Sequence, residues 1–345
     1  MAGAPFINRG RYSLFAGSLE EYSSLAIELV QTSTVIDMLG LLTLDFRKLF
    51  AWQLDPKRFG PRDFEKTKAA GITVFHTAVG YNSGDIHAAS LADIEGWNRL
   101  IIARPEYFVR VEKTADLIAA KASGKIGILI GQQNSSHFRT IFDVDAFYQM
   151  GQRVSQLTYY HNRLGGGSTD AHDTGLTAYG GEVVARMNQL GMAVDVSHCG
   201  DRTTLDAIDA SQHPVLVTHS NCRVLVPGSA RCKTDDAIRR MAAKGGVMGI
   251  TMIRFFVGAS GAVTMENFLD HVDHVAKVAG VDHVGLGSDR DVDGFDPKAN
   301  LDGVNYSKKV FDLTQGLLRR NYSRADIELI LGKNFERALQ QIWSS

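Results

Sequence analysis

Short runs of apolar and β-branched residues recur along the chain, and each gap between them has room for a helix. A run that is apolar almost throughout predicts a strand buried on both faces, as in a parallel sheet. Eight such strands that alternate with helices predict an α/β fold, namely a (β/α)8 TIM barrel. The eight runs are residues 34–39, 72–79, 126–131, 154–159, 193–198, 214–219, 246–252 and 283–289.

The segments between the runs carry helix signals. Ser18 and Glu21 have capping-box spacing ahead of an apolar stretch, so we expect a helix to begin there. Near the other end, Ser323 is placed to cap a helix and Gly332 to end it. An open doubly wound sheet is the alternative to the barrel, but no G-x-G-x-x-G motif follows the first run.

One domain accounts for the whole sequence. Its length is within the range of a single α/β barrel, and we find no internal repeat, low-complexity segment or linker. We therefore predict one barrel domain over residues 1–345, in which residues 1–33 form an N-terminal helical extension. The longest irregular stretch, residues 161–181, follows the end of a predicted strand, where barrels build their active-site loops.

Polar side chains stand where several runs end. His198 and His219 close two consecutive runs, Asp289 closes the last one, and Gln133 directly follows the third. In a barrel these ends surround one cavity. A single histidine at a strand end is more often a packed residue than a ligand. Two of them with a carboxylate suit Zn²⁺ or a similar ion, which lowers the pKa of a bound water and polarises a carbonyl.

Composition and charge limit the partners and the location that the sequence predicts. The formal net charge is −1, and lysine and arginine cluster only in short pairs, so we expect no nucleic acid or anionic membrane partner. Three cysteines without paired spacing do not form a disulfide framework. The sequence shows neither a signal peptide nor an apolar stretch long enough for a membrane span, which predicts a cytoplasmic location. Other catalytic motifs, such as G-x-S-x-G, H-E-x-x-H and the Walker loop, are missing from the sequence.

Longer motifs then point to a family. The segment GLTAYGGEVVARMNQLGMAVDVSHCGDRT resembles the central part of the membrane (renal) dipeptidase family, and HPVLVTHSNCRVL, RCKTDDAIRRMAAKGGVMGI, HVGLGSDRD and GKNFERAL continue the match in order. The resemblance covers roughly residues 34–340. It implies a metal-dependent barrel of the amidohydrolase kind that cleaves dipeptides, commonly with two zinc ions. It also implies a homodimer.

The resemblance assigns roles to individual positions. His198 and His219 match the two imidazole ligands of one zinc ion. Asp289 matches the aspartate that binds the other zinc and handles the proton of the attacking water. Arg231 matches an arginine that holds the carboxylate of the substrate, a task that suits a guanidinium because it pairs with two oxygens at once.

Three positions depart from the family pattern. Where the family's first strand ends in Asp-Gly-His-Asn-Asp, this chain keeps Asp37 but has Leu39 and Leu41 in place of the ligands. Gln133, with Gln132 as the alternative, stands where the family has a bridging glutamate. Tyr159 replaces a substrate-binding histidine, for which His161 is a partial substitute. Because the losses fall on one of the two metal positions, we expect one zinc ion or none.

Three functions follow from these residues. The first is a mononuclear metallohydrolase that acts on a dipeptide or an N-acyl amino acid, with metal ligands from His198, His219, Gln133 and Asp289. The second is a non-hydrolytic tailoring enzyme for a peptide-derived natural product, in which Tyr159, His161, His198 and Asp289 act as acid and base groups. The third is a catalytically inactive homologue.

Overall fold

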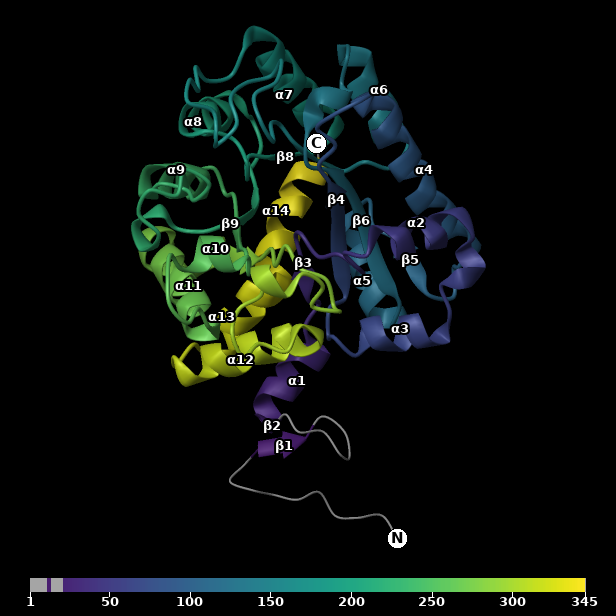
Figure 1. Cartoon of the computed structure of the whole chain (residues 1–345), viewed down its shortest axis with the longest axis vertical. Helices are drawn as coiled ribbons and strands as arrows, with labels where there is room; N and C mark the ends of the chain where they lie inside the picture. The colour runs from purple at the N-terminus through teal and green to yellow at the C-terminus, as the bar shows by residue number, and fades with distance from the viewer. Residues whose placement is uncertain (1–10, 14–20, 345) are drawn as a thin grey trace.

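The computed structural model describes residues 11–13 and 21–344. Its centre is a barrel of parallel strands with helices around the outside (Figure 1). Each of the eight apolar runs contains one barrel strand, so the predicted (β/α)8 fold is confirmed. In spatial order the strands are β8 (Ala193–Asp195), β7 (Val154–Gln156), β6 (Ile126–Gln132), β4 (Val74–Val79), β3 (Ile36–Asp37), β11 (Val284–Leu286), β10 (Met248–Ile250) and β9 (Val217–Ser220).

The barrel closes where β8 meets β9. An isolated parallel bridge joins Asp195 to Leu216. The backbone N–H of Val196 donates to the carbonyl of Leu216 at 3.0 Å, and the N–H of Leu216 donates to the carbonyl of Val194 at 2.9 Å. We call this short junction the seam. His198 lies just beyond one of its strands and His219 lies in the other.

Helices cover the strands and close the base of the barrel. Phe335, Ala338 and Leu339 are fully buried in a cluster with residues of the strands, so the last helix plugs the end opposite the two histidines. A Cβ at Gly285 would collide with the ring of Phe335, which explains the glycine in β11. The helices are α1 (Ser24–Thr32), α2 (Phe46–Leu54), α3 (Pro61–Lys68), α4 (Ile86–Ala103), α5 (Thr114–Ser123), α6 (Ile141–Gln149), α7 (Ala178–Leu190), α8 (Asp201–Ala210), α9 (Asp235–Ala243), α10 (Arg254–Val257), α11 (Met265–Ala279), α12 (Lys309–Arg319), α13 (Arg324–Glu328) and α14 (Asn334–Trp343).

One strand lies outside the barrel path. β5 (Phe108–Arg110) pairs in parallel with the first half of β6, from Phe108 opposite Ile126 to Arg110 opposite Ile128. β7 pairs with the second half of the same strand. The sequence pattern does not predict β5, because its apolar stretch lies between the charged Glu106 and Arg110 and is not part of a longer apolar run.

The N-terminal end of the chain differs in detail from the predicted helix. β1 (Arg11–Ser13) and β2 (Glu21–Ser23) form an antiparallel pair, so Glu21 is in a strand and the prediction of a helix there is wrong. Ser18, its predicted cap, lies outside the described residues. The helix starts later because the Ser23 hydroxyl accepts a bond from the N–H of Ala26 and caps α1.

The prediction that Gly332 ends a helix agrees with the backbone. Gly332 has a φ of 179° and a ψ of −29°, which are non-helical, so the helical run that begins with α13 ends at a kink there and α14 follows it. A Cβ at Gly332 would collide with the carbonyl oxygen of Thr34. The glycine therefore permits a close approach between two backbones at the kink where one helix ends and the next begins.

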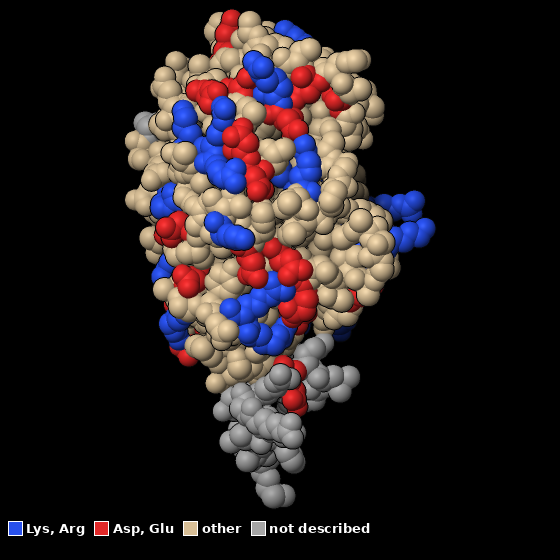
Figure 2. All heavy atoms as spheres, turned by 90° about the vertical axis from the view of Figure 1, so that its left-hand side faces the viewer, with Lys and Arg blue, Asp and Glu red and all other residues tan. Residues whose placement is uncertain are grey.

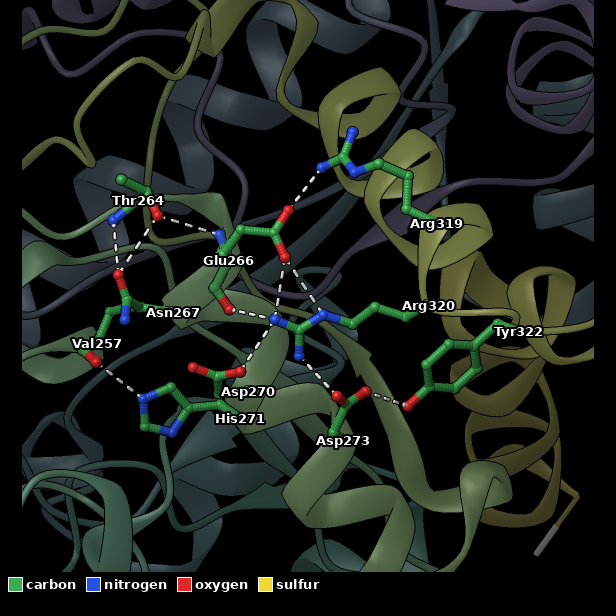
Figure 3. A network of polar contacts seen from close by, with 10 residues as sticks. All are labelled: Val257, Thr264, Glu266, Asn267, Asp270, His271, Asp273, Arg319, Arg320 and Tyr322. Atoms are coloured by element: carbon green, nitrogen blue, oxygen red, sulfur yellow. Dashed lines mark hydrogen bonds and ion pairs between the residues drawn. The ribbon is translucent and has the colours of Figure 1, made fainter.

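The face that carries α11 and α12 mixes both signs of charge, as Figure 2 shows. Arg320 is the centre of a network between the two helices, in which its guanidinium pairs with Glu266, Asp270 and Asp273 (Figure 3). Tyr322 donates to the same Asp273 at 2.8 Å. The network fixes α12 against α11 at the surface of the barrel. Within the described ranges, no helix has the length and apolar character that crossing a membrane requires.

Candidate functional site

The two strand-end histidines meet across the seam. The Nε2 atoms of His198 and His219 are 3.0 Å apart, and their ring centroids are 5.0 Å apart. His219 is fully buried, whereas His198 is partly buried at the mouth of the barrel. The prediction that two consecutive strands bring their histidines together therefore agrees with the geometry. A packed pair of core histidines would not need to point both Nε2 atoms at one place.

A buried hydrogen-bond chain orients the ring of His219. The Thr218 hydroxyl donates to Asp195 Oδ2 at 2.7 Å, so its single proton is engaged. The contact of 2.8 Å between Thr218 Oγ1 and His219 Nδ1 is then a bond that Nδ1–H donates. This arrangement leaves the lone pair of His219 on Nε2, where it faces His198. Ser197 supports it by donating to Asp195 and accepting from the backbone N–H of His219.

Both imidazoles are held in the neutral form that binds metals. Burial lowers the pKa of His198 well below its usual value, and the positive charge of Arg231 adds to the effect. The pKa of His219 is lowered in the same way, first by burial and then by Arg231. A neutral imidazole presents a free lone pair, so the pair is ready to ligate at neutral pH.

Arg231 is bonded to the backbone of both segments that carry the histidines. Its Nη1 donates to the carbonyl of Ser197 at 2.6 Å and to the Ser220 hydroxyl at 3.0 Å, and its Nη2 donates to the carbonyl of His219 at 2.7 Å. The side chain is almost fully buried, yet its Nε–H has no hydrogen-bond partner among the described residues. A buried unpartnered donor on a cation is costly, and an incoming carboxylate would satisfy it.

Tyr159 covers His198 from the side of the long loop. The two rings are stacked, with centroids 4.0 Å apart and an interplanar angle of 21°. A Cβ at Gly80 would lie 2.9 Å from Cδ2 of Tyr159, so the glycine makes room for the ring. Burial raises the pKa of the Tyr159 phenol, and the charge of Asp289 raises it further. The phenol is therefore a neutral hydrogen-bond donor at the mouth.

Asp289 follows β11 in an unusual backbone conformation. Its φ is 55°, in the left-handed region that few residues other than glycine adopt. Its backbone N–H donates to the carbonyl of Leu39 at 2.7 Å, which ties it to the end of β3. Burial raises the pKa of the Asp289 carboxyl to about 7, against the opposing charges of Arg231 and Arg290. The carboxyl can therefore take up and release a proton near neutral pH.

Strand alternation settles which glutamine faces the mouth. Gln132 points outward, because its Nε2 donates to Asp93 of α4 at 3.0 Å. Gln133 lies at the mouth near Gly80, and its Nε2 donates to the carbonyl of Ala78 at 2.9 Å. With its N–H group engaged, the amide oxygen is the only atom of Gln133 that can act as a ligand.

The end of β3 is apolar where metal ligands would be needed. Leu39 and Leu41 are buried, at 0% and 4% exposure. Asp37 is engaged elsewhere, because it accepts two bonds from Ser288 and pairs with Lys309 at 3.4 Å, both side chains being fully buried. The polar groups of Asp37, Ser288 and Lys309 at this corner of the mouth therefore bond to one another in the interior.

His161 lies apart from the other candidates. Its ring is 64% exposed, and Nδ1 contacts Asp170 Oδ2 at 2.7 Å within the long loop. No recorded contact joins it to His198, His219 or Asp289. The structure therefore brings His198, His219, Tyr159 and Arg231 together and leaves His161 on the loop surface.

Two groups at the site are not found by the sequence analysis. Lys233 is buried two residues after Arg231, and its Nζ donates to the carbonyl of Cys199 and to the Thr204 hydroxyl, each at 2.9 Å. Burial lowers the pKa of Lys233 to about 8. The other group is Asp195 with Thr218. The signal that could have found it is a polar residue inside an otherwise apolar run, just ahead of each histidine.

The nitrogens of His198 and His219 are spaced as two ligands of one metal ion would be. Two imidazole ligands of a tetrahedral zinc lie about 3.3 Å apart, close to the separation of the His198 and His219 nitrogens. No group of three or more His, Cys, Asp or Glu that could hold a metal occurs among the described residues. At the end of β3, the side chains of Leu39 and Leu41 are buried and apolar, and neither can ligate a metal ion.

Comparisons with known proteins agree on one family. A family model described as membrane dipeptidase (peptidase family M19) matches residues 25–344. An uncharacterised dipeptidase of Schizosaccharomyces pombe is 33% identical over 259 residues, which is 72% of this chain and 61% of the relative. Dipeptidase tcpJ of Claviceps purpurea is 30% identical over 274 residues, which is 75% of this chain and 62% of the relative. The match thus spans about three-fifths of the length of each relative.

A solved structure extends the comparison to three dimensions. The crystal structure of an amidohydrolase from Pseudomonas aeruginosa superposes with a TM-score of 0.81 at 28% identity, and the superposition covers 93% of this chain and 99% of that one. The barrel described above is therefore the fold of that amidohydrolase.

Proposed function

Because this chain belongs to the membrane dipeptidase family, peptidase family M19, we propose that it hydrolyses the amide bond of a dipeptide or an N-acyl amino acid. The observation that carries the proposal is the meeting of His198 and His219, with Arg231 bonded to the backbone of the segments that carry them. Two neutral imidazoles can hold a metal ion, and the guanidinium can hold a carboxylate. A substrate for such a site has an amide bond next to a free carboxylate.

One zinc ion is the proposed cofactor. His198 and His219 supply its imidazole ligands, and Asp289 and the amide oxygen of Gln133 are the further candidates at the same mouth. When bound, the ion polarises the scissile carbonyl and makes a water molecule more acidic. Two neutral rings add no negative charge to the site, so we expect weaker zinc binding than at a site with several carboxylates.

The chain's own residues account for the other requirements of hydrolysis. Arg231 orients the substrate through the carboxylate, for which its Nε–H is available because it has no partner among the described residues. Asp289 accepts a proton from water and returns it to the leaving amine, as its pKa of about 7 allows. Tyr159 holds the ring of His198 in place by stacking and offers a phenolic proton to the substrate.

A metal count and a hydrolysis assay test this function together. The full chain, purified without a metal-binding tag, is loaded with Zn²⁺, dialysed and analysed by mass spectrometry. We expect one ion per chain and cleavage of dipeptides that a chelator abolishes. His198→Ala should lose both. His213→Ala should keep both, because His213 lies just before β9 at the opposite end of the barrel and its side chain forms no hydrogen bond within the described ranges.

Other outcomes would contradict specific parts of the proposal. Two ions per chain would contradict the mononuclear site. Cleavage that resists chelation would contradict the role of the metal. Absence of hydrolysis with the ion bound would favour the second candidate, a non-hydrolytic tailoring enzyme of a peptide-derived natural product. The stacked Tyr159 and the protonatable Asp289 favour that candidate, since both can transfer protons without hydrolysis.

A further inference from the structure

A second cavity opens at the base of the barrel, far from the histidine pair. Its volume is about 340 Å³, within the size range of small-molecule sites. Thr73 and Gly71 line it just before β4, at the end where the parallel strands begin. Its other walls come from α1, α3, α5 and the start of α12. Figure 1 places α1, α3 and α12 at this end of the barrel, beside the N-terminal strands.

Three lysines from three different segments line this base cavity. They are Lys68 of α3, Lys121 of α5 and Lys308 just before α12, and no aspartate or glutamate lines the cavity with them. Among the described residues, neither Lys68 nor Lys121 forms an ion pair. Burial lowers the pKa of both, and the charge of Lys68 lowers that of Lys121 further. Glu65, one turn earlier on α3, offsets part of the effect on Lys68.

Helix capping explains only part of this arrangement. Lys121 Nζ donates to the carbonyl of Gln31 in the last turn of α1 at 2.6 Å, and Lys308 Nζ donates to the carbonyl of Ala69 after α3. Lys68 Nζ, in contrast, makes no hydrogen bond in the described part of the chain. An ammonium group has three donors, so Lys68 and Lys121 retain unused N–H groups at the cavity.

A hydroxyl adds to the donors. Thr73 Oγ1 accepts a bond from the backbone N–H of Val35 at 3.3 Å, which leaves its own proton without an acceptor among the described residues. On the apolar side, the ring of Phe311 has Lys308 Nζ 5.7 Å from its centroid. The cavity therefore combines several cationic and neutral donors with one aromatic wall.

We propose that the base cavity binds a phosphate-bearing small molecule. A phosphate group carries close to two negative charges and three acceptor oxygens, which match the donors of Lys68, Lys121 and Thr73. Bound phosphate would relieve the mutual repulsion of the lysines. The remainder of the ligand would lie against Phe311. This site is separate from the proposed hydrolytic site, since it lies at the other end of the strands.

Titration calorimetry on the full chain tests the site with three probes: inorganic phosphate, pyrophosphate and glycerol phosphate. We expect saturable binding that Lys68→Gln and Lys121→Gln each weaken by about tenfold or more, because a charge-assisted bond is lost. The exposed Lys277→Gln on α11 is the matched control and should bind as the wild type does. Tighter binding of glycerol phosphate than of inorganic phosphate would identify an ester as the ligand class, and the reverse order would identify the free anion.

Thermal unfolding separates a binding site from a structural cluster. If the lysines serve an anion, Lys68→Gln without ligand should unfold at the wild-type temperature or above it, because repulsion is removed. It should also hydrolyse dipeptides at the wild-type rate. A lower unfolding temperature, equal affinity in wild type and Lys68→Gln, or no saturable binding up to about 10 mM of any probe would overturn the proposal.

Discussion

Replacing Asp93 by asparagine is expected to change how the stability of the barrel depends on pH. Asp93 of α4 is 3% exposed, and no ion pair reaches it among the described residues. Its two oxygens accept bonds from Gln53 Nε2 at 3.2 Å and from Gln132 Nε2 at 3.0 Å. Burial raises the pKa of this carboxyl to about 6, and the two amide bonds offset only part of the increase.

The size and sign of the effect follow from this shift. A rise from 3.8 to about 6 corresponds to about 3 kcal/mol of free energy of unfolding. The pKa of Asp93 is higher in the folded state than in the unfolded state. Its contribution to the free energy of unfolding is therefore complete below the unfolded pKa, and it is lost as pH rises through the folded pKa. The ionised Asp93 carboxylate therefore destabilises the folded state above about pH 6, whereas the protonated carboxyl does not.

Urea unfolding at about pH 4 and about pH 7 measures this contribution. The free energy of unfolding of Asp93→Asn, relative to that of the wild type, should increase by about 2–3 kcal/mol from the lower to the higher pH, because asparagine does not ionise. Asp282→Asn, at an exposed position, is the matched control and should show no such gain. A difference between wild type and Asp93→Asn that stays constant across this range would refute the assignment of the shift to burial.

Two further predictions concern the mouth of the barrel. Arg231→Lys should raise KM for a dipeptide about tenfold, because lysine lacks the planar fork that binds a carboxylate; equal KM values for wild type and variant would contradict that role. Thr218→Val removes the acceptor of His219 Nδ1–H and should weaken zinc binding about 10- to 100-fold, while Thr218→Ser should restore it. Competition with a chelating dye measures both zinc affinities, and an unchanged affinity in the valine variant would exclude the orienting chain.

The barrel could be predicted because its strands are buried on both faces. Such strands appear in the sequence as apolar runs, and each run contained a barrel strand. β5 could not be predicted, because charged residues flank its short apolar stretch and it is not part of a longer apolar run. The first helix was placed too early because Glu21 has the spacing of a capping residue, whereas in the structure it pairs with Ser13 of β1.

At the site, the sequence predicts proximity better than orientation. The ends of β8 and β9 had to be neighbours once the fold was a barrel, so the contact between His198 and His219 follows from topology. The sequence does not indicate that Asp195 and Thr218 fix the ring of His219, because that depends on which way two buried side chains turn. It equally could not show that His161 pairs with Asp170 on the loop.

A metal ion bound between the two histidines would also stabilise the junction of β8 and β9. Asp195 and Leu216 form an isolated bridge where the cylinder closes, and the two histidines lie on opposite sides of it. An ion held by one ring from each side would link β8 to β9 at the point where the barrel closes. Loading with zinc should then slow amide hydrogen exchange of Val196 and Leu216. The amides that join β4 to β6 should be slowed less, because their ladder is longer and no metal ion links the two strands.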